Sequence, residues 1–158
     1  GDVLTLIEKA EQAIDLKKAQ ELEKKMKTST FTFTDFLDQI DQIIKNRPKG
    51  FLVLSGDDGM TVDVMRKGGD GVISVAVDAF PKRFSHVVYL ASQGLFDRAE
   101  EAYEPLHEAV CALFEQGNPT GVKAALAILG QIDNVLRLPL VPACDDTYSE
   151  LEQAMTLL

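Results

Sequence analysis

The sequence predicts a mostly α-helical protein with one small α/β unit, in which two parallel strands are surrounded by about seven helices. Three observations lead to this prediction. Two short apolar runs, the second rich in β-branched residues, flank a stretch with room for about two helical turns. Loops containing glycine stand beside both runs, and apolar residues elsewhere recur at helical spacing. Two buried strands joined by a helix run parallel, so the unit is predicted to be a βαβ unit.

The βαβ unit is predicted between residues 50 and 78. Its first strand is expected over Phe51–Leu54 and its second over Val72–Val77, with a helix between them over Met60–Lys67. The glycines of Gly68-Gly69-Asp70-Gly71 precede a strand instead of opening a helix, and the lysine of a phosphate-binding loop is missing. This segment therefore predicts a tight turn that contains positive φ angles.

Residues before the βαβ unit are predicted to be helical. Val3, Ile7, Ala10 and Ile14 open an amphipathic pattern that breaks at Asp15 and resumes up to Met26, so that Asp15 either caps a second helix or marks a bend. A threonine-rich connector leads to a second helix over about Asp35–Asn46, which ends before Pro48. We expect that helix to turn one apolar side inward, formed by Phe36, Leu37, Ile40, Ile43 and Ile44.

Residues after the βαβ unit are also predicted to be helical. The first helix begins at Pro81, a residue favoured in the first helical turn, and ends near Gly94. A longer helix over Asp97–Gln116 contains Pro105, which is expected to kink it or to remain near its first turns. Two further helices are expected, one from Asn118-Pro119 to Gly130 and a last one over Thr147–Leu157, after an extended stretch over residues 136–142.

Composition narrows the class of protein. The 158 residues are about one domain, and their net charge of −9 argues against nucleic acid as a partner. No apolar run approaches the roughly 18 residues that cross a membrane, so no membrane partner is expected. The two cysteines, Cys111 and Cys144, are too few for a disulfide framework, which favours reduced thiols and a cytoplasmic location.

Few residues stand out as candidates for chemistry. Asp57, Asp58 and Asp78 follow the predicted strands, where three carboxylates would suit Mg²⁺. The alternative, which we favour, is that Asp57 and Asp58 are turn and capping residues of the next helix. His86 and His107 have no ligand-spaced partners and are interpreted as surface or half-buried histidines, with Cys111 as a thiol at the edge of the core.

Residues from about 42 to 158 resemble the C-terminal part of dihydrodipicolinate synthase, within the family that includes N-acetylneuraminate lyase. The resemblance lies in the order and spacing of Leu54-Ser55-Gly56-Asp57-Asp58, Gly68-Gly69-Asp70-Gly71-Val72-Ile73-Ser74-Val75, Asn118-Pro119 with Val122-Lys123, and Leu136-Arg137-Leu138-Pro139. The resemblance implies a (β/α)₈ barrel followed by a helical domain, and a lyase that holds pyruvate on a lysine as a Schiff base before aldol condensation with aspartate semialdehyde.

On this resemblance, residues 42–80 are a quarter of the barrel and residues 81–158 are the C-terminal helical domain. Gly56 and Ile73 match positions that line the pyruvate pocket. The strand with the Schiff-base lysine has no counterpart, and Lys45, Lys49, Lys67 and Lys123 fall on predicted helices or loops. We therefore expect no catalytic residue, cofactor or metal in this chain, which points away from an enzyme.

Residues 1–41 resemble a different family, the signal recognition particle GTPases. Gly1-Asp2-Val3-Leu4 and Ile7-Glu8-Lys9-Ala10 are similar to the close of its GTPase domain. Thr30-Phe31-Thr32 and Asp35-Phe36-Leu37-Asp38-Gln39-Ile40 are similar to the start of its methionine-rich domain. The two resemblances together suggest an artificial or recombinant chimera without intact native activity. The alternative is a lyase of the 4-hydroxy-tetrahydrodipicolinate synthase type, which acts in lysine biosynthesis.

Two parallel strands cannot close a barrel and leave two open edges. The edges beside Val53, Ile73 and Val75 therefore predict a homo-oligomer, in its simplest form a dimer whose strands join into a larger sheet.

Overall fold

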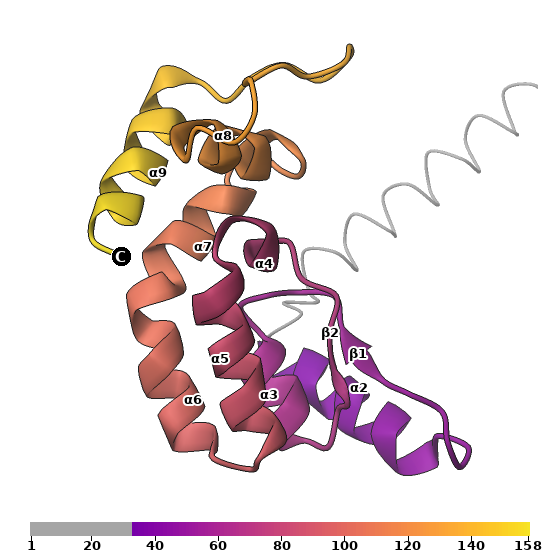
Figure 1. Ribbon diagram of the computed structural model, residues 1–158. Helices are drawn as coiled ribbons and strands as arrows, with labels where there is room; N and C mark the ends of the chain where they lie inside the picture. Colours follow the sequence, from indigo (N-terminus) through magenta and orange to yellow (C-terminus); the bar gives the residue numbers. More distant parts are fainter. Residues whose placement is uncertain (1–32) are drawn as a thin grey trace, which may run out of the picture. The chain divides into compact units, whose positions relative to one another are not determined.

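The computed structural model describes residues 33–158, of which Leu37–Leu158 form one compact unit (Figure 1). This unit is described below by itself. In chain order the elements are α2 (Phe33–Asn46), β1 (Leu54–Ser55), α3 (Thr61–Arg66), β2 (Gly71–Val72), α4 (Ala76–Ala79), α5 (Pro81–Ser92), α6 (Phe96–Tyr103), a 3₁₀ turn η1 (Glu104–Leu106), α7 (His107–Phe114), α8 (Thr120–Ile128) and α9 (Asp145–Thr156).

The two strands pair in parallel, as predicted. Leu54 lies opposite Gly71 and Ser55 opposite Val72. The pairing extends beyond the strands at both ends, where the Asp70 amide donates to the Val53 carbonyl at 2.8 Å and the Ile73 amide donates to the Ser55 carbonyl at 2.9 Å. Each strand has only two residues, so both are shorter than predicted.

The strand predicted over Val72–Val77 is wrong in its second half, because the chain turns after Ile73 and enters helix α4. The run of β-branched residues favours a strand only when its amides can pair with a neighbouring strand. Here the amides of Val75 and Ala76 donate instead to the Asp58 carboxylate, at 3.1 and 3.0 Å. A side chain 17 residues away in the sequence therefore decides the local structure.

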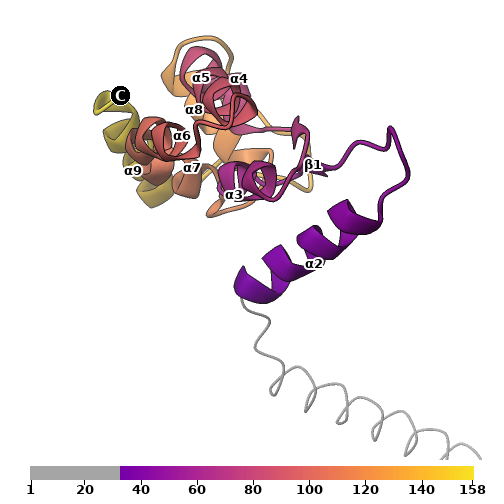
Figure 2. The same cartoon turned by 90° about the horizontal axis from the view of Figure 1, so that it is seen from below.

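The hydrophobic core lies among the helices and not between the strands. Helix α5 packs against α3, α4 and α6, while α7, α8 and α9 pack against one another. Both views place β1 on the side opposite α6, α7 and α9 (Figures 1 and 2). The largest fully buried side chains are Phe84, Leu106, Leu113, Leu151, Val64, Val87 and Thr61.

The described residues form eight α-helices, whereas six of the seven predicted helices fall within them. One extra helix is α4. The other arises because Pro105 divides the helix predicted over Asp97–Gln116 into α6 and α7, with the 3₁₀ turn η1 between them. The predicted effect of Pro105 is therefore confirmed: proline has no amide hydrogen to donate within a helix.

Helix α2 differs from the prediction in its burial. None of its residues is buried, and Ile43, which we expected to face inward, is 51% exposed. Within the described residues, no neighbouring element covers this side of the helix with enough apolar surface to bury it. The helical stretch predicted up to Met26 lies outside the described residues, and so does most of the segment 1–41 that resembles a second family.

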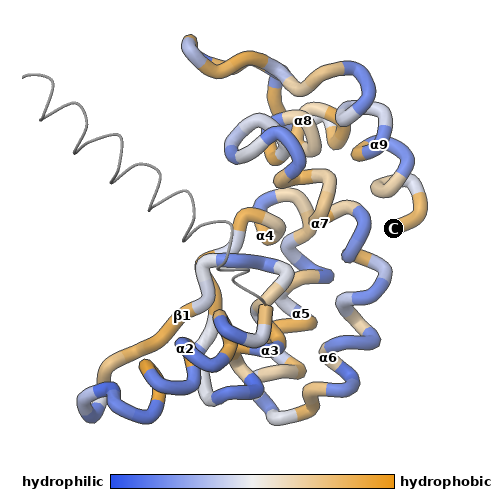
Figure 3. Tube along the Cα trace, turned by 180° about the vertical axis from the view of Figure 1, so that it is seen from behind, coloured by the Kyte–Doolittle hydropathy of each residue, from blue (hydrophilic) through white to orange (hydrophobic). Residues whose placement is uncertain are grey.

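Apolar side chains remain exposed around the strands. Figure 3 shows a hydrophobic stretch that runs into β1. It contains Phe51, Leu52 and Leu54, all exposed, and Ile73 next to β2 is exposed as well. No helix of residues 33–158 is long and apolar enough to cross a membrane.

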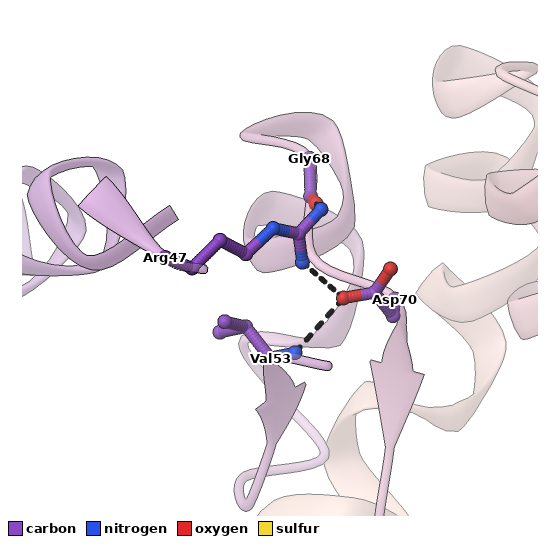
Figure 4. A network of polar contacts seen from close by, with 4 residues as sticks. All are labelled: Arg47, Val53, Gly68 and Asp70. Carbon is purple, nitrogen blue, oxygen red and sulfur yellow. Dashed lines mark hydrogen bonds and ion pairs between the residues drawn. The ribbon is translucent and has the colours of Figure 1, made fainter. Parts of the chain in front are cut away.

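One ion pair and two hydrogen bonds between a side chain and a backbone group connect the segments that lead into the two strands. Figure 4 shows the four residues involved. The Asp70 carboxylate accepts a hydrogen bond from the Val53 amide at 2.8 Å and pairs with the Arg47 guanidinium. Arg47 also donates to the Gly68 carbonyl at 3.3 Å. Gly68 has a φ of +102°, so the turn with positive φ that the glycines predicted is confirmed.

These contacts lower the pKa of Asp70, above all the hydrogen bond from the Val53 amide and then Arg47. Because the pKa is lower in the folded chain than in the unfolded one, the carboxylate stabilises the fold above its ordinary pKa of 3.8. That stabilisation is lost as the pH falls through the lower, folded value.

We predict that the Asp70→Asn variant loses less stability than the parent chain when the pH is lowered below about 4. Urea unfolding at a series of pH values measures this dependence. Arg47→Gln is the matched control and should give an intermediate dependence, because the Val53 amide still favours the charged carboxylate. A variant D70N as acid-sensitive as the parent chain would contradict the assignment.

Candidate functional site

The candidate site lies where the two strands end. Gly56 directly follows β1, and Ile73 directly follows β2. The parallel register continues through the hydrogen bond from the Ile73 amide to the Ser55 carbonyl, which brings these two residues to the same end of the pair. Ile73 is 73% exposed, and a Cβ atom added to Gly56 would meet no atom within 4 Å. The structure thus presents both predicted pocket residues on one open surface.

Asp57 forms the turn that follows Gly56. Its carboxylate accepts a hydrogen bond from the Met60 amide at 3.0 Å, just before α3. The Ser55 hydroxyl donates to the Asp57 carbonyl at 2.7 Å, and the Thr61 hydroxyl donates to the same carbonyl at 3.1 Å. All three hydrogen bonds are local and lie within the turn between β1 and α3, so the turn interpretation is confirmed for Asp57.

Asp58 has a different role from its neighbour. Only 2% of it is exposed, and its Oδ2 atom accepts the amides of Val75 and Ala76. The sequence suggested that Asp58 caps the next helix, α3. In the structure it caps α4 instead. Its Oδ1 atom is buried without a hydrogen-bond partner. The capping bonds fix the backbone that leads out of β2, and with it the position of Ile73.

The three aspartates do not form a metal site. Asp57 and Asp58 are used by backbone amides, and Asp78 is exposed on the short helix α4. Within residues 33–158, no group of three or more His, Cys, Asp or Glu side chains could hold a metal ion. The Mg²⁺ hypothesis therefore has no support in the part of the chain that the structure describes.

No lysine of the described residues lies in either strand. Lys45 lies in α2, Lys67 caps α3 at its C-terminus and Lys123 lies in α8, where its amine donates to the Val135 carbonyl. A lysine must be held without a proton to attack a carbonyl, which requires a desolvated or cationic setting. Neither strand of the described pair therefore carries an amine that could react beside Gly56 and Ile73.

Comparison with known proteins defines the class to which this architecture belongs. A model described as the dihydrodipicolinate synthetase family matches residues 8–158. The 4-hydroxy-tetrahydrodipicolinate synthase of Parabacteroides distasonis is 46% identical over 120 residues, which cover 76% of this chain and 40% of the relative. The enzyme of that name from Thermotoga neapolitana is 40% identical over 119 residues, which cover 73% and 40%.

Solved structures agree with this assignment. Dihydrodipicolinate synthase from Thermotoga maritima matches with a TM-score of 0.73 and 38% identity, over 77% of this chain and 43% of that one. A structure described as the first monomeric dihydrodipicolinate synthase variant matches with a TM-score of 0.73 and 37% identity, over 77% and 41%. The chain belongs to the dihydrodipicolinate synthetase family. It spans about 40% of the length of the curated relatives it matches.

The Asp58 capping bonds predict that Asp58→Ala lowers the free energy of unfolding by about 3 kcal/mol, because a buried and a half-buried amide lose their acceptor. Asp57→Ala is the matched control and should cost only about 1 kcal/mol, since its single hydrogen bond is exposed. Urea unfolding monitored by circular dichroism measures both values. Equal losses in the two variants would contradict the special role of Asp58.

Proposed function

We propose that this chain is the C-terminal part of a pyruvate-dependent lyase of the 4-hydroxy-tetrahydrodipicolinate synthase type. The observation that carries the proposal is the placement of Gly56 and Ile73 at one end of a parallel pair, in a chain 46% identical to such a synthase over 120 residues. The comparisons favour this lyase hypothesis over a chimera without native activity, which was our first prediction from the sequence.

In this proposal residues 42–80 are the last quarter of a (β/α)₈ barrel, and residues 81–158 form the helical domain behind it. The ends of parallel strands are where barrel enzymes bind their substrates. Gly56 would leave room for pyruvate because it has no side chain, and the exposed Ile73 would supply an apolar wall. An apolar wall excludes water and strengthens the electrostatic interactions of a bound carboxylate and imine.

The Schiff-base lysine would come from the part of the barrel that precedes these strands in the family. The chain's own contribution is then binding and orientation: Asp58 holds the turn that carries Ile73, and Asp57 holds the loop after Gly56. No step of the reaction would depend on a cofactor or a metal ion.

We predict that residues 37–158, placed behind the first part of the Parabacteroides distasonis synthase in place of its matched C-terminal portion, form an active hybrid. The hybrid should form an adduct with labelled pyruvate that borohydride traps, and should condense pyruvate with aspartate semialdehyde. The 158-residue chain alone should form no adduct. Radiolabel incorporation and a coupled condensation assay measure the two activities.

The pocket residues provide the controls for this experiment. Ile73→Asp in the hybrid should reduce condensation at least about tenfold with little loss of folding, because the side chain is exposed and points away from the core. Leu138→Asp, which changes an equally exposed apolar residue in the loop before α9, should have little effect. A folded hybrid without adduct, or a chain that forms an adduct by itself, would refute the proposal.

A chimera without intact native activity is the second candidate. Its support is that the match to the Parabacteroides distasonis relative covers 120 residues, close to the 117 residues from 42 to 158 that carry the resemblance. Against it, the family model extends back to residue 8. The sequence of the native gene decides: an uninterrupted natural reading frame across residues 1–158 would exclude an artificial join.

Self-association is proposed from the exposed apolar side chains around the strands. Phe51, Leu52 and Ile73 are exposed beside open strand edges, where a second copy could add strands and bury them. We predict that the 158-residue chain is a dimer at micromolar concentration by light scattering, and that Leu52→Lys shifts it towards the monomer. A parent chain that stays monomeric at high micromolar concentration would refute this.

A further inference from the structure

A cavity lies along α7 and α9, and neither Gly56 nor Ile73 is among its lining residues. Its volume is about 660 Å³. Helix α9 crosses α7 here, and the small side chains of Ala112 and Ala154 leave space between them. The lining residues are His107, Glu108, Cys111, Ala112, Glu115, Glu150, Gln153, Ala154 and Leu157.

A nucleophile and a base lie side by side in this cavity. His107 and Cys111 are four residues apart on α7 and therefore share one face of the helix. The Cys111 Sγ atom is 3.8 Å from the His107 Nε2 atom, and both side chains are exposed to the cavity. The ring of Tyr103 meets the His107 ring edge-on at 6.1 Å, which restricts the imidazole to this side.

The charged side chains that line the cavity around this pair are acidic. Glu108 and Glu115 line the cavity from α7, Glu150 lines it from α9, and no lysine or arginine is among its lining residues. Glu115 also accepts a hydrogen bond from the Thr147 hydroxyl at 2.8 Å, which holds one carboxylate in place. Carboxylates around a concave surface attract cations and repel anions before contact.

We propose that the His107–Cys111 pair is a thiol–disulfide exchange site that selects small cationic disulfides. The Cys111 thiol gives its proton to His107 Nε2, and the resulting thiolate attacks one sulfur of the disulfide. A new bond forms between Cys111 Sγ and that sulfur as the original S–S bond breaks. The leaving thiolate then takes the proton from His107, so the disulfide reagent is the oxidant and Cys111 is oxidised to a mixed disulfide.

Cys144 offers a comparison within the same chain. It precedes α9, lines a separate hollow of about 340 Å³, and its sulfur accepts a hydrogen bond from the Gln116 amide at 3.2 Å. The Thr147 side chain and backbone amides at the start of α9 lower the pKa of Cys144. Cys144 therefore has its own reactivity, with Gln116 and Thr147 as hydrogen-bond partners in place of a histidine. Any modification must for this reason be assigned to one of the two thiols.

The test uses the full chain with Cys144→Ser, so that Cys111 is its single thiol. Three disulfides are compared: cystamine with two ammonium groups, neutral hydroxyethyl disulfide, and dithiodiglycolate with two carboxylates. Mass spectrometry follows modification at neutral pH, and each rate is divided by that of the same reagent with the urea-unfolded chain. We expect the ratio for cystamine to exceed that for dithiodiglycolate about tenfold at low salt and to fall at high salt.

Two further variants separate charge from proton transfer. Glu108→Gln with Glu150→Gln should reduce the preference for cystamine while leaving the neutral reagent unchanged. His107→Gln should slow all three reagents at least about tenfold and change the pH profile of the rate. Equal normalised rates for cystamine and dithiodiglycolate would overturn the selectivity, and an unchanged rate and pH profile in H107Q would overturn the role of the pair.

Discussion

The buried carboxylate of Asp58 is the constraint on which the rest of the strand region depends. It lies in the middle of the loop between β1 and α3 and accepts two amides from the start of α4, so it joins the exits of both strands. A buried charge is costly unless hydrogen bonds compensate it. The two amides provide that compensation at Oδ2 alone, since Oδ1 has no hydrogen-bond partner. In turn the carboxylate ends β2 and starts a helix. The position of Ile73 beside Gly56 follows from this one connection.

The sequence was a good guide wherever local signals determine the structure. Pro81 at the start of α5, Pro105 at the 3₁₀ turn and Gly68 in the turn before β2 all act through their own backbone geometry, so their effects were predicted. The strand predicted at Val75–Val77 is wrong because a distant contact, and not a local signal, determines the structure there. Apolar β-branched residues fit a strand or a short buried helix, and only the distant Asp58 decides between them.

The candidate site was less predictable than the fold. Gly56 and Ile73 carry no chemical signal of their own, and only the resemblance to a family singled them out. The acidic residues Asp57 and Asp58 suggested a metal, but in the structure they serve the backbone. The spacing of His107 and Cys111 was visible in the sequence, yet the cavity beside them depends on α9, which packs there from about 40 residues further along the chain.

The placement of the core has a consequence for how this chain fluctuates. The buried hydrophobic cluster draws its members from α3 to α9 and from η1, and neither β1 nor β2 contributes a buried member among the described residues. Separating the two strands therefore exposes little of the buried hydrophobic cluster. Amide protons of the strands should exchange with solvent through local fraying, while those of α5, α7 and α8 exchange only when the whole helical unit opens. The helices from α5 onward would then be a separately cooperative module, able to keep their packing while the strand pair opens and closes.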